Sequence, residues 1–311
     1  MSKVDTLEPY LEKHFSKNYL GSRDLAKISY LKTGGVANHC ILLNDEKSLE
    51  AFERYIFGKI PYIILGRCSN VLISDRGFDE VVIFIDSKYL ENSFFHPAKK
   101  SENNLIFPSG MAMSRAVHLA HQNFLGGIEF FIGIPGSIGG AVFMNAGAEG
   151  SATADYLSEV FIFRDGAFRW VLANQLDLSY RHSNIKKEEI VFAASFRLNP
   201  LDQQGVRENR RQCLKNLQIR KSKQPLGEPS LGSTFKNPPN NYAAKLIQQA
   251  GLMGFREGGI SVSKKHANFL HNDGSGTSKQ ALTLIAKIEE KVYQSCLVKL
   301  QREIILLGDF S

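Results

Sequence analysis

Residues 133–148, with the sequence Gly-Ile-Pro-Gly-Ser-Ile-Gly-Gly-Ala-Val-Phe-Met-Asn-Ala-Gly-Ala, constrain the fold of this chain more than any other segment. Glycine at this density, beside Pro, Ser and Asn, is not expected to form a regular core element. It tolerates positive φ angles and leaves its N–H groups accessible, so successive amides can point at one anion, of which a pyrophosphate is the best candidate. An ordinary tight turn is the alternative.

The segment lacks the dinucleotide-binding fingerprint of Rossmann folds. That fingerprint is G-x-G-x-x-G at a strand-to-helix turn, followed about 20 residues later by an acidic residue. Here Gly133, Gly136 and Gly139 recur at every third position, and no G-x-G occurs.

Length and charge narrow the class of protein. A chain of 311 residues is long enough for about two domains. The net charge of +7 suits anionic small molecules. Nucleic acid is not expected as a partner, because the densest basic cluster, Arg207–Lys223, lacks interleaved aromatic residues. The polar N-terminus and the absence of an apolar run near 20 residues predict neither a signal peptide nor a membrane span, and favour the cytoplasm.

No metal site is expected. The four cysteines are far apart and form no C-x-x-C, which argues against a zinc site or a disulfide framework and favours a reducing compartment. His118 and His121 share one face of an expected helix, but the sequence shows no third ligand and no acidic partner, so both are interpreted as packed or solvated residues.

Apolar periodicity predicts alternating strands and helices. Strands are expected over 40–43, 62–65, 81–85, 105–108, 159–164, 168–172 and 190–198, and helices over 47–56, 113–122 and 204–221. Beyond residue 225, helix and strand alternate over 242–250, 260–262, 268–271, 279–296 and 303–307. Asp165-Gly166 predicts a hairpin. The polar turn 66–75 follows a buried strand, where α/β units bind ligands. A change of composition after residue 198 predicts a domain boundary near 200.

Three further clusters carry polar side chains: 179–183 (Ser-Tyr-Arg-His-Ser), 230–238 (Ser-Leu-Gly-Ser-Thr-Phe-Lys-Asn-Pro) and Arg302-Glu303. Alone, each is more often surface structure, a turn or helix cap, or a solvated acid. Residues 180–183 and 232–238 of the first two clusters, taken with 66–75, 133–147 and 263–269, occur in an order and spacing that resemble the UDP-N-acetylenolpyruvoylglucosamine reductase family over about residues 30–308.

The resemblance implies an α+β fold, in which an FAD-binding region of the vanillyl-alcohol-oxidase type with two subdomains (1–86 and 87–200) precedes an α/β substrate-binding domain (201–311). It implies an NADPH-dependent flavoenzyme that reduces the enolpyruvyl ether of UDP-N-acetylglucosamine to the lactyl ether, for peptidoglycan synthesis. A monomer is expected. Only six residues, 184–189, separate Ser183 from the strand at Ile190, so the chain resembles the short-loop, type II form.

The resemblance also assigns site residues. Catalytic roles fall on Arg181, Ser233 and Glu303. FAD contacts are expected from Gly66, Ser69, Asn70, Val71, Gly133, Pro135, Gly136, Ser137, Gly139, Gly140, Asn145 and Ala146. Substrate contacts are expected from Tyr180, Lys223, Asn237, Lys264 and Lys265.

The chain departs from the family pattern at three places. Gly66-Arg67-Cys68-Ser69-Asn70 stands where Gly-Gly-Gly-Ser-Asn is usual, so Arg67 and Cys68 must have negative φ angles or be strained. Val36 replaces a common proline, and Arg302 stands before Glu303 where proline is typical.

The expected chemistry is a hydride addition to the enol ether followed by a protonation. Hydride addition places negative charge on the substrate carboxylate, which Arg181 can grip bidentately. Ser233 then protonates the α-carbon, and Glu303, if it is neutral, donates a hydrogen bond to the enediolate. Two alternatives stay open: another FAD-dependent alcohol or sugar oxidase, and a non-catalytic UDP-sugar-binding module. The sequence does not distinguish NADPH from NADH.

Overall fold

The computed structural model of the protein describes residues 3–86 and 103–311. The chain forms two compact units, each assembled from segments that are far apart in sequence. Unit 1 comprises Met1–Ser22, His39–Arg67 and Asp79–Leu217, and unit 2 comprises Arg23–Asn38, Cys68–Phe78 and Gln218–Ser311. The three contiguous domains expected from the sequence stay a prediction.

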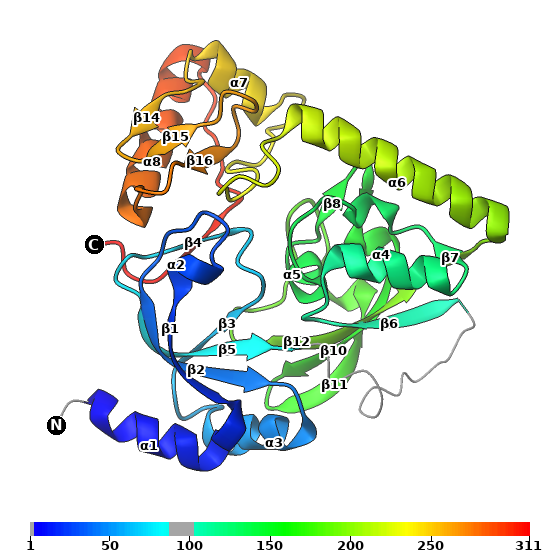
Figure 1. The fold of residues 1–311 in the computed structure, drawn as a ribbon, viewed down its shortest axis with the longest axis vertical. Coiled ribbons are helices and arrows are strands. Elements are labelled where there is room, and N and C mark those ends of the chain that lie inside the picture. The colour runs from blue at the N-terminus through cyan, green and yellow to red at the C-terminus, as the bar shows by residue number, and fades with distance from the viewer. Residues whose placement is uncertain (1–2, 87–102) are drawn as a thin grey trace. The chain divides into compact units, whose positions relative to one another are not determined.

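The first layer of unit 1 is a four-stranded sheet accompanied by two helices that contact each other (Figure 1). The strand order is β1 (Tyr19–Asp24), β2 (Val36–Leu43), β5 (Phe78–Ile85) and β3 (Tyr62–Leu65), and the helices are α1 (Lys3–Phe15) and α3 (Glu46–Tyr55). α3 begins at a capping box formed by Asp45 and Ser48. Its buried Leu49 and Phe52 belong to one cluster with Ile41 of β2.

A second, antiparallel sheet forms the centre of unit 1. Its strand order is β11 (Ala167–Leu172), β10 (Leu157–Arg164), β12 (Ile190–Arg197) and β6 (Asn104–Pro108). Asp165 and Gly166 both have positive φ angles, 53° and 76°, as a two-residue type I′ hairpin requires, so the predicted hairpin is confirmed.

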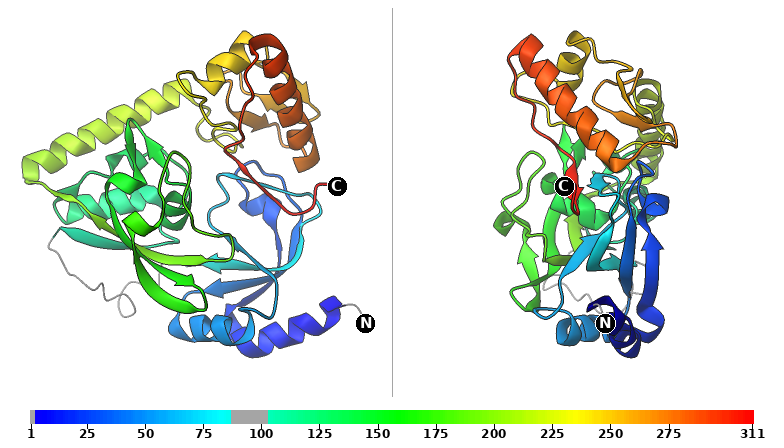
Figure 2. Two further views of the ribbon diagram at one scale, coloured as in Figure 1. Left: turned by 180° about the vertical axis from the view of Figure 1, so that it is seen from behind. Right: turned by 90° about the vertical axis from the view of Figure 1, so that its left-hand side faces the viewer.

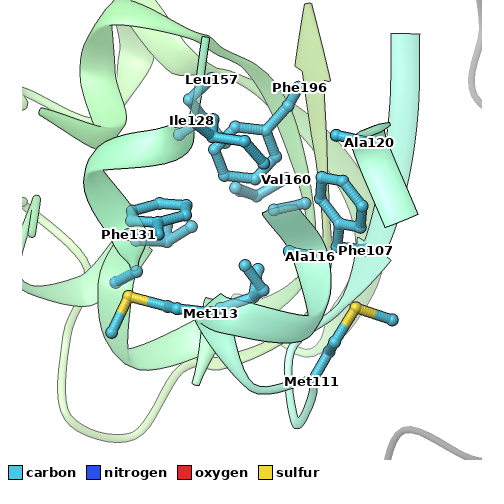
Figure 3. Close-up of a cluster of buried hydrophobic side chains, with 14 of the residues drawn as sticks. Phe107, Met111, Met113, Ala116, Ala120, Ile128, Phe131, Leu157, Val160 and Phe196 are labelled. Carbon is cyan, nitrogen blue, oxygen red and sulfur yellow. The ribbon is translucent and has the colours of Figure 1, made fainter. Parts of the chain in front are cut away.

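This second sheet is buried on both faces because β10 is apolar at successive positions. Val160 and Ile162 enter one hydrophobic cluster, and Phe161 and Phe163 enter another. The first cluster, shown in Figure 3, includes helix α4 (Met113–Gln122), whose buried residues recur at helical spacing.

Several short elements complete unit 1. They are η1 (Ser16–Asn18), β7 (Leu125–Gly126), η2 (Glu129–Phe131), α5 (Ile138–Phe143), β8 (Gly147–Ala148), β9 (Ser151–Ala152), η3 (Thr153–Asp155), η4 (Ala173–Gln175) and β13 (Asn199–Pro200). Helix α6 (Gln203–Lys223) follows as one continuous helix (Figure 2), and only Val206 and Cys213 of its residues are buried.

Unit 2 packs around helix α8. Its elements are α2 (Leu25–Ile28), β4 (Val71–Ile73), α7 (Ala243–Gln249), β14 (Arg256–Glu257), β15 (Ile260–Val262), β16 (Leu270–Asn272), α8 (Ser278–Cys296) and β17 (Ile305–Leu307). β4 and β17 pair in parallel. Both oxygens of Asp75 accept hydrogen bonds from the first amides of α8, at 2.8 Å (Ser278) and 2.9 Å (Lys279). Leu284, Ile285 and Ile288 bury the inner face of α8 in the core of the unit.

The predicted α+β class is confirmed, and every predicted strand and helix coincides with or overlaps an observed one. The elements that were not predicted include α1, β1, β4 and α5, besides shorter helices and strands such as α2, β7 and β14. The expectation that residues 133–148 contain no regular element was wrong for α5, because Ile138, Ala141 and Val142 recur at helical spacing and are buried. Across residues 3–86 and 103–311, no helix is long and apolar enough to cross a membrane.

Candidate active site

The glycine-rich segment combines two tight backbone turns with the start of a helix. Gly133 and Gly136 have φ angles of 79° and 147°, which favour glycine. Ser137 is the N-cap of α5, and its Oγ accepts a hydrogen bond from the amide of Gly140 at 3.4 Å. The segment is therefore both a turn and a helix start.

Only part of this segment can present amides to an anion. The N–H groups of Ile138 and Gly139 donate to the carbonyls of Met111 (2.9 Å) and Ser109 (2.8 Å). In the part of the chain that the structure describes, the N–H groups of Gly133, Gly136 and Ser137 donate to no protein acceptor. Backbone donors left unpaired at such positions are usually satisfied by a ligand or by water.

Close packing against Ser109 explains why residue 139 is glycine. A Cβ atom there would lie 2.9 Å from Cβ of Ser109. A Cβ atom on Gly66 would lie 3.0 Å from Oγ of Ser137, so the turn that begins at Gly66 and the start of α5 touch within unit 1. Gly66 and Ser137, which approach each other here, are about 70 residues apart in the sequence.

At Cys68, where the family pattern that the sequence resembles has glycine, the backbone is strained. Cys68 has a φ of 52° and is buried, whereas Arg67 is absent from the residues with positive φ. A left-handed conformation is costly for a residue with a Cβ atom. Burial raises the pKa of the Cys68 thiol to about 12, so the thiolate is scarce at neutral pH.

Arg181 is carried on a tight turn that the glycine-rich segment holds in place. Ser179 and His182 exchange backbone hydrogen bonds at 3.2 and 3.1 Å, which leaves Tyr180 and Arg181 at the tip of the turn. Asn145 Nδ2 donates to the carbonyl of Ser179 at 2.8 Å.

Two further bonds attach the same turn. Ser183 Oγ donates to the carbonyl of Phe143 at 2.7 Å, and Arg181 Nη2 donates to the carbonyl of Gly147 at 3.1 Å. The guanidinium also lies 5.2 Å from the centre of the exposed Tyr180 ring. Three hydrogen bonds therefore hold this turn on the glycine-rich segment, and they orient the Arg181 side chain.

Asn145 has a structural role that its predicted FAD contact did not include. Besides binding Ser179, its Oδ1 accepts a hydrogen bond from the amide of Ala154 at 2.9 Å. Asn145 is buried, and its backbone has a positive φ of 41°. The FAD contacts of Asn145 and Ala146 stay predictions.

Ser233 and Glu303 come together in unit 2, although 70 residues separate them in sequence. The amide of Glu303 donates to the carbonyl of Thr234, the residue after Ser233, at 2.8 Å. Asn268 stabilises this arrangement, because its side chain accepts from the amide of Phe235 (3.0 Å) and donates to the same residue's carbonyl (2.8 Å). Asn268 lies in segment 263–269, which the sequence analysis singled out, but no role was assigned to it. An asparagine between apolar residues could have indicated a buried side-chain amide that needs partners.

The turn predicted to bind FAD also reaches Glu303. Asn70 Nδ2 donates to the carbonyl of Glu303 at 3.2 Å, and the amide of Ile305 donates to the carbonyl of Asn70 at 3.0 Å. Val71 then begins β4 beside Ile305 of β17. Ser69 precedes this contact in the same turn.

Among the described residues, no side-chain contact joins the three predicted substrate-binding lysines to one another. Lys265 Nζ donates to the carbonyl of Lys221 at 2.6 Å, near the C-terminus of α6. Lys223 and Lys264 are exposed. Asn237 Oδ1 accepts a hydrogen bond from the amide of Ala243, the first residue of α7, at 3.0 Å.

Within the described residues no group of three His, Cys, Asp or Glu side chains is placed to hold a metal. His121, which had no visible acidic partner in the sequence, does have one: its Nε2 lies 2.9 Å from Glu129 Oε1. Asn209 donates to the same oxygen at 2.7 Å. His121 is therefore a buried structural residue.

Comparisons with known proteins agree over nearly the whole chain. The family model described as "UDP-N-acetylenolpyruvoylglucosamine reductase, C-terminal domain" matches residues 224–307. The enzyme of that name from Caldicellulosiruptor saccharolyticus is 36% identical over 296 residues, which cover 94% of this chain and 93% of the relative. The enzyme from Staphylococcus saprophyticus is 37% identical over 289 residues, which cover 92% of this chain and 90% of the relative. The crystal structure of the enzyme from Thermus caldophilus, 29% identical, aligns with a TM-score of 0.77 over 92% of this chain and 98% of that chain.

Proposed function

Because the chain belongs to the UDP-N-acetylenolpyruvoylglucosamine reductase family, we propose that it is a UDP-N-acetylmuramate dehydrogenase. It uses NADPH and FAD to reduce the enolpyruvyl ether of UDP-N-acetylglucosamine to the lactyl ether during peptidoglycan synthesis. The observation that carries this function is the match to relatives of one activity over more than nine-tenths of the chain. We also propose that the enzyme acts in the cytoplasm as a monomer, without nucleic acid.

The residues of unit 1 fit an FAD pyrophosphate. The N–H groups of Gly133, Gly136 and Ser137 have no acceptor in the described protein, and a Cβ atom on Gly66 would make a tight contact of 3.0 Å with Ser137 Oγ. Such a cradle of unpaired amides suits an anion. Bound FAD would carry the hydride from NADPH to the enol ether.

Arg181 would bind the carboxylate of the substrate. Its guanidinium is a permanently charged fork, and the turn that carries it is fixed by Asn145 and Ser183. A cation that is already oriented stabilises the negative charge that develops in the transition state, because the cation does not have to move during the reaction. Arg181 therefore favours the enediolate over the ground-state carboxylate.

Ser233 would deliver the proton to the α-carbon, with Glu303 beside it. The hydrogen bond between the amide of Glu303 and the carbonyl of Thr234 holds the two residues on adjacent backbone segments. A neutral Glu303 donates a hydrogen bond to the enediolate, whereas an ionised one would repel it. Tyr180, Asn237 and the lysines Lys223, Lys264 and Lys265 remain the proposed contacts of the UDP-sugar.

The test is to purify the protein, record its visible spectrum, and follow NADPH absorbance with and without the enolpyruvyl UDP-sugar. We expect a flavin spectrum, NADPH oxidation that depends on the UDP-sugar, and a lactyl ether product by mass spectrometry. Binding of the UDP-sugar without any NADPH oxidation that depends on it would support a non-catalytic binding module. Oxidation of alcohols or sugars at the expense of oxygen would instead favour an oxidase of the same fold.

A further inference from the structure

Arg302, the residue before Glu303, forms a two-point ion pair with helix α8. Its Nε lies 2.6 Å from Glu289 Oε1, and its Nη2 lies 2.7 Å from Glu289 Oε2. The side chains are 32% and 27% exposed, so water screens the pair only partly. A bidentate guanidinium–carboxylate pair fixes direction as well as distance.

The ion pair fixes the chain just ahead of the proposed acid. The segment from Leu297 to Gln301, which connects α8 to Arg302, forms no helix or strand. Beyond Arg302, both peptide groups of Glu303 are held, by the carbonyl of Thr234 and by Asn70 Nδ2. Ile304 then enters the buried cluster that contains the inner face of α8. Val298 and Leu300 also pack against this cluster. Arg302 adds to these contacts a directional, two-point link to α8 at the residue that precedes Glu303.

The backbone bridge at Arg302 uses the peptide groups of its two neighbours, Gln301 and Glu303. Arg302 pairs with Phe235 in an isolated bridge whose two hydrogen bonds use the neighbouring amides of Lys236 and Glu303. Within the described residues the amide of Arg302 itself donates no hydrogen bond. Proline at this position would lose no bond, and it would restrict the backbone through its fixed φ.

We propose that Arg302 is a positioning residue for Glu303, and that its ion pair with Glu289 restrains the backbone that precedes Glu303. The proposal rests on the proposed function, because it takes Glu303 as the group that contacts the developing enediolate. Arg302 touches neither substrate nor FAD in this role. It keeps the backbone before Glu303 in one arrangement.

The experiment measures the two half-reactions separately by stopped-flow absorbance: flavin reduction by NADPH, and flavin reoxidation by the enolpyruvyl UDP-sugar. In Arg302→Ala we expect reoxidation to slow by about tenfold, since small displacements of a catalytic group are costly, while reduction changes by less than about twofold. Arg302→Pro should restore reoxidation to within about threefold of the parent enzyme. Glu289→Gln, which breaks the same pair from the other side, should resemble Arg302→Ala.

A matched control separates positioning from general loss of stability. Lys287 is also on α8, and it pairs with Glu257 of β14 rather than with the segment that precedes Glu303, so Lys287→Ala should leave both half-reactions unchanged. Melting temperatures are recorded for every variant. A purely structural ion pair would lower the melting temperature of Arg302→Ala and slow both half-reactions equally, and that result would overturn the proposal.

Glu303→Gln distinguishes failure of this proposal from failure of the proposed function. If the parent enzyme does not reduce the UDP-sugar, the function itself is wrong. If the parent is active but Glu303→Gln reoxidises normally, Glu303 is not the group that needs positioning and the proposal fails. If Glu303→Gln is slow while Glu289→Gln and Arg302→Ala reoxidise at the parental rate, the ion pair does not position Glu303.

Discussion

Cys68 shows how one residue can be out of keeping with its own backbone. A φ of 52° suits glycine, and burial of the side chain in unit 2 does not remove the steric cost of the Cβ atom. The sequence predicted that this position would have a negative φ or would be strained, and the structure shows the strained alternative.

The strain predicts an inverted order of stability. At most sites alanine is more stable than glycine, but at Cys68 we expect Cys68→Gly to unfold with a free energy about 1 kcal/mol higher than Cys68→Ala. Urea denaturation of both variants measures the difference. Cys213 is the matched control, because it is buried within helix α6, where glycine should be the less stable by about 1 kcal/mol. The same order at both sites would show that Cys68 is unstrained.

Ser233→Ala tests the proposed proton donor. The backbone around Ser233 is held by hydrogen bonds of Thr234 and Phe235 with Asn268, so removing one hydroxyl should leave the fold intact. We expect FAD to stay bound and NADPH to bleach it at the normal rate. Reoxidation by the UDP-sugar should fall by roughly 100-fold or more, as for loss of a general acid. Parental turnover would exclude Ser233 as the donor.

Arg181→Lys tests the carboxylate fork. Lysine keeps the charge but loses the planar pair of donors, and it would also lose the bond geometry to the carbonyl of Gly147. Flavin reoxidation should slow by roughly 10- to 100-fold, with little change in reduction by NADPH. Arg169, whose Nη2 donates to the carbonyl of Arg164 at an exposed hairpin, is the control for a simple Arg-to-Lys change. Unchanged reoxidation would remove Arg181 from the mechanism.

At the scale of elements, helix α3 depends on the charge of its N-cap. Asp45 Oδ1 accepts from the amide of Ser48 at 2.8 Å, and Lys17 Nζ lies 3.5 Å from Asp45 Oδ2. Burial alone would raise the pKa of Asp45, but the hydrogen bonds from Ser48 and the charge of Lys17 outweigh it and hold the pKa below its ordinary value of 3.8. The ionised cap therefore stabilises the folded state.

This cap predicts a pH-dependent difference between the parent and Asp45→Asn. Asparagine also caps helices, so only the contribution of the charge is removed, about 0.5 kcal/mol for a partly exposed group. Because the folded pKa lies below the unfolded one, the difference should be complete above about pH 5 and should vanish as the pH falls below the folded pKa. Urea denaturation at neutral and acid pH measures it. A difference that grows on acidification would contradict this sign.

Elements with a long apolar pattern were predictable, and those that depend on distant partners were not. Helices α4 and α8 and strands β10 and β12 have unambiguous periodicity. β4 was hidden inside a polar turn because its partner, β17, lies more than 230 residues later. α5 was missed because two glycines lower its helix propensity, while burial against the core outweighs that cost.

At the scale of the whole molecule, the site residues were recognised from order and spacing, but their surroundings were not. The resemblance named Asn70 and Glu303 separately, and only the fold shows the side chain of one bound to the backbone of the other. Which amides of the glycine-rich segment remain unpaired likewise depends on Met111 and Ser109, which lie outside it. Local sequence does not encode such contacts.

The whole protein should hold its flavin without a covalent bond. Oxidases of the alternative class commonly link FAD through His or Cys, so the state of the cysteine in the predicted FAD turn is informative. Cys68 is that residue, and its buried thiol, with a pKa near 12, is a poor nucleophile at neutral pH. Acid precipitation of the purified holoenzyme should therefore leave a colourless pellet and a yellow supernatant whose absorbance accounts for the flavin.

The control is Cys68→Gly, which removes the thiol and places at this position the residue that its φ of 52° favours. We expect it to bind and release FAD as the parent does, because the unpaired amides of Gly133, Gly136 and Ser137 are unchanged. Colour that stays with the parent pellet but leaves with Cys68→Gly would identify a thioether to Cys68 and favour an oxidase. Colour that stays in both would place the link on another residue. Only complete release from both proteins agrees with a flavin that is held by backbone amides and exchanges hydride within a reductase.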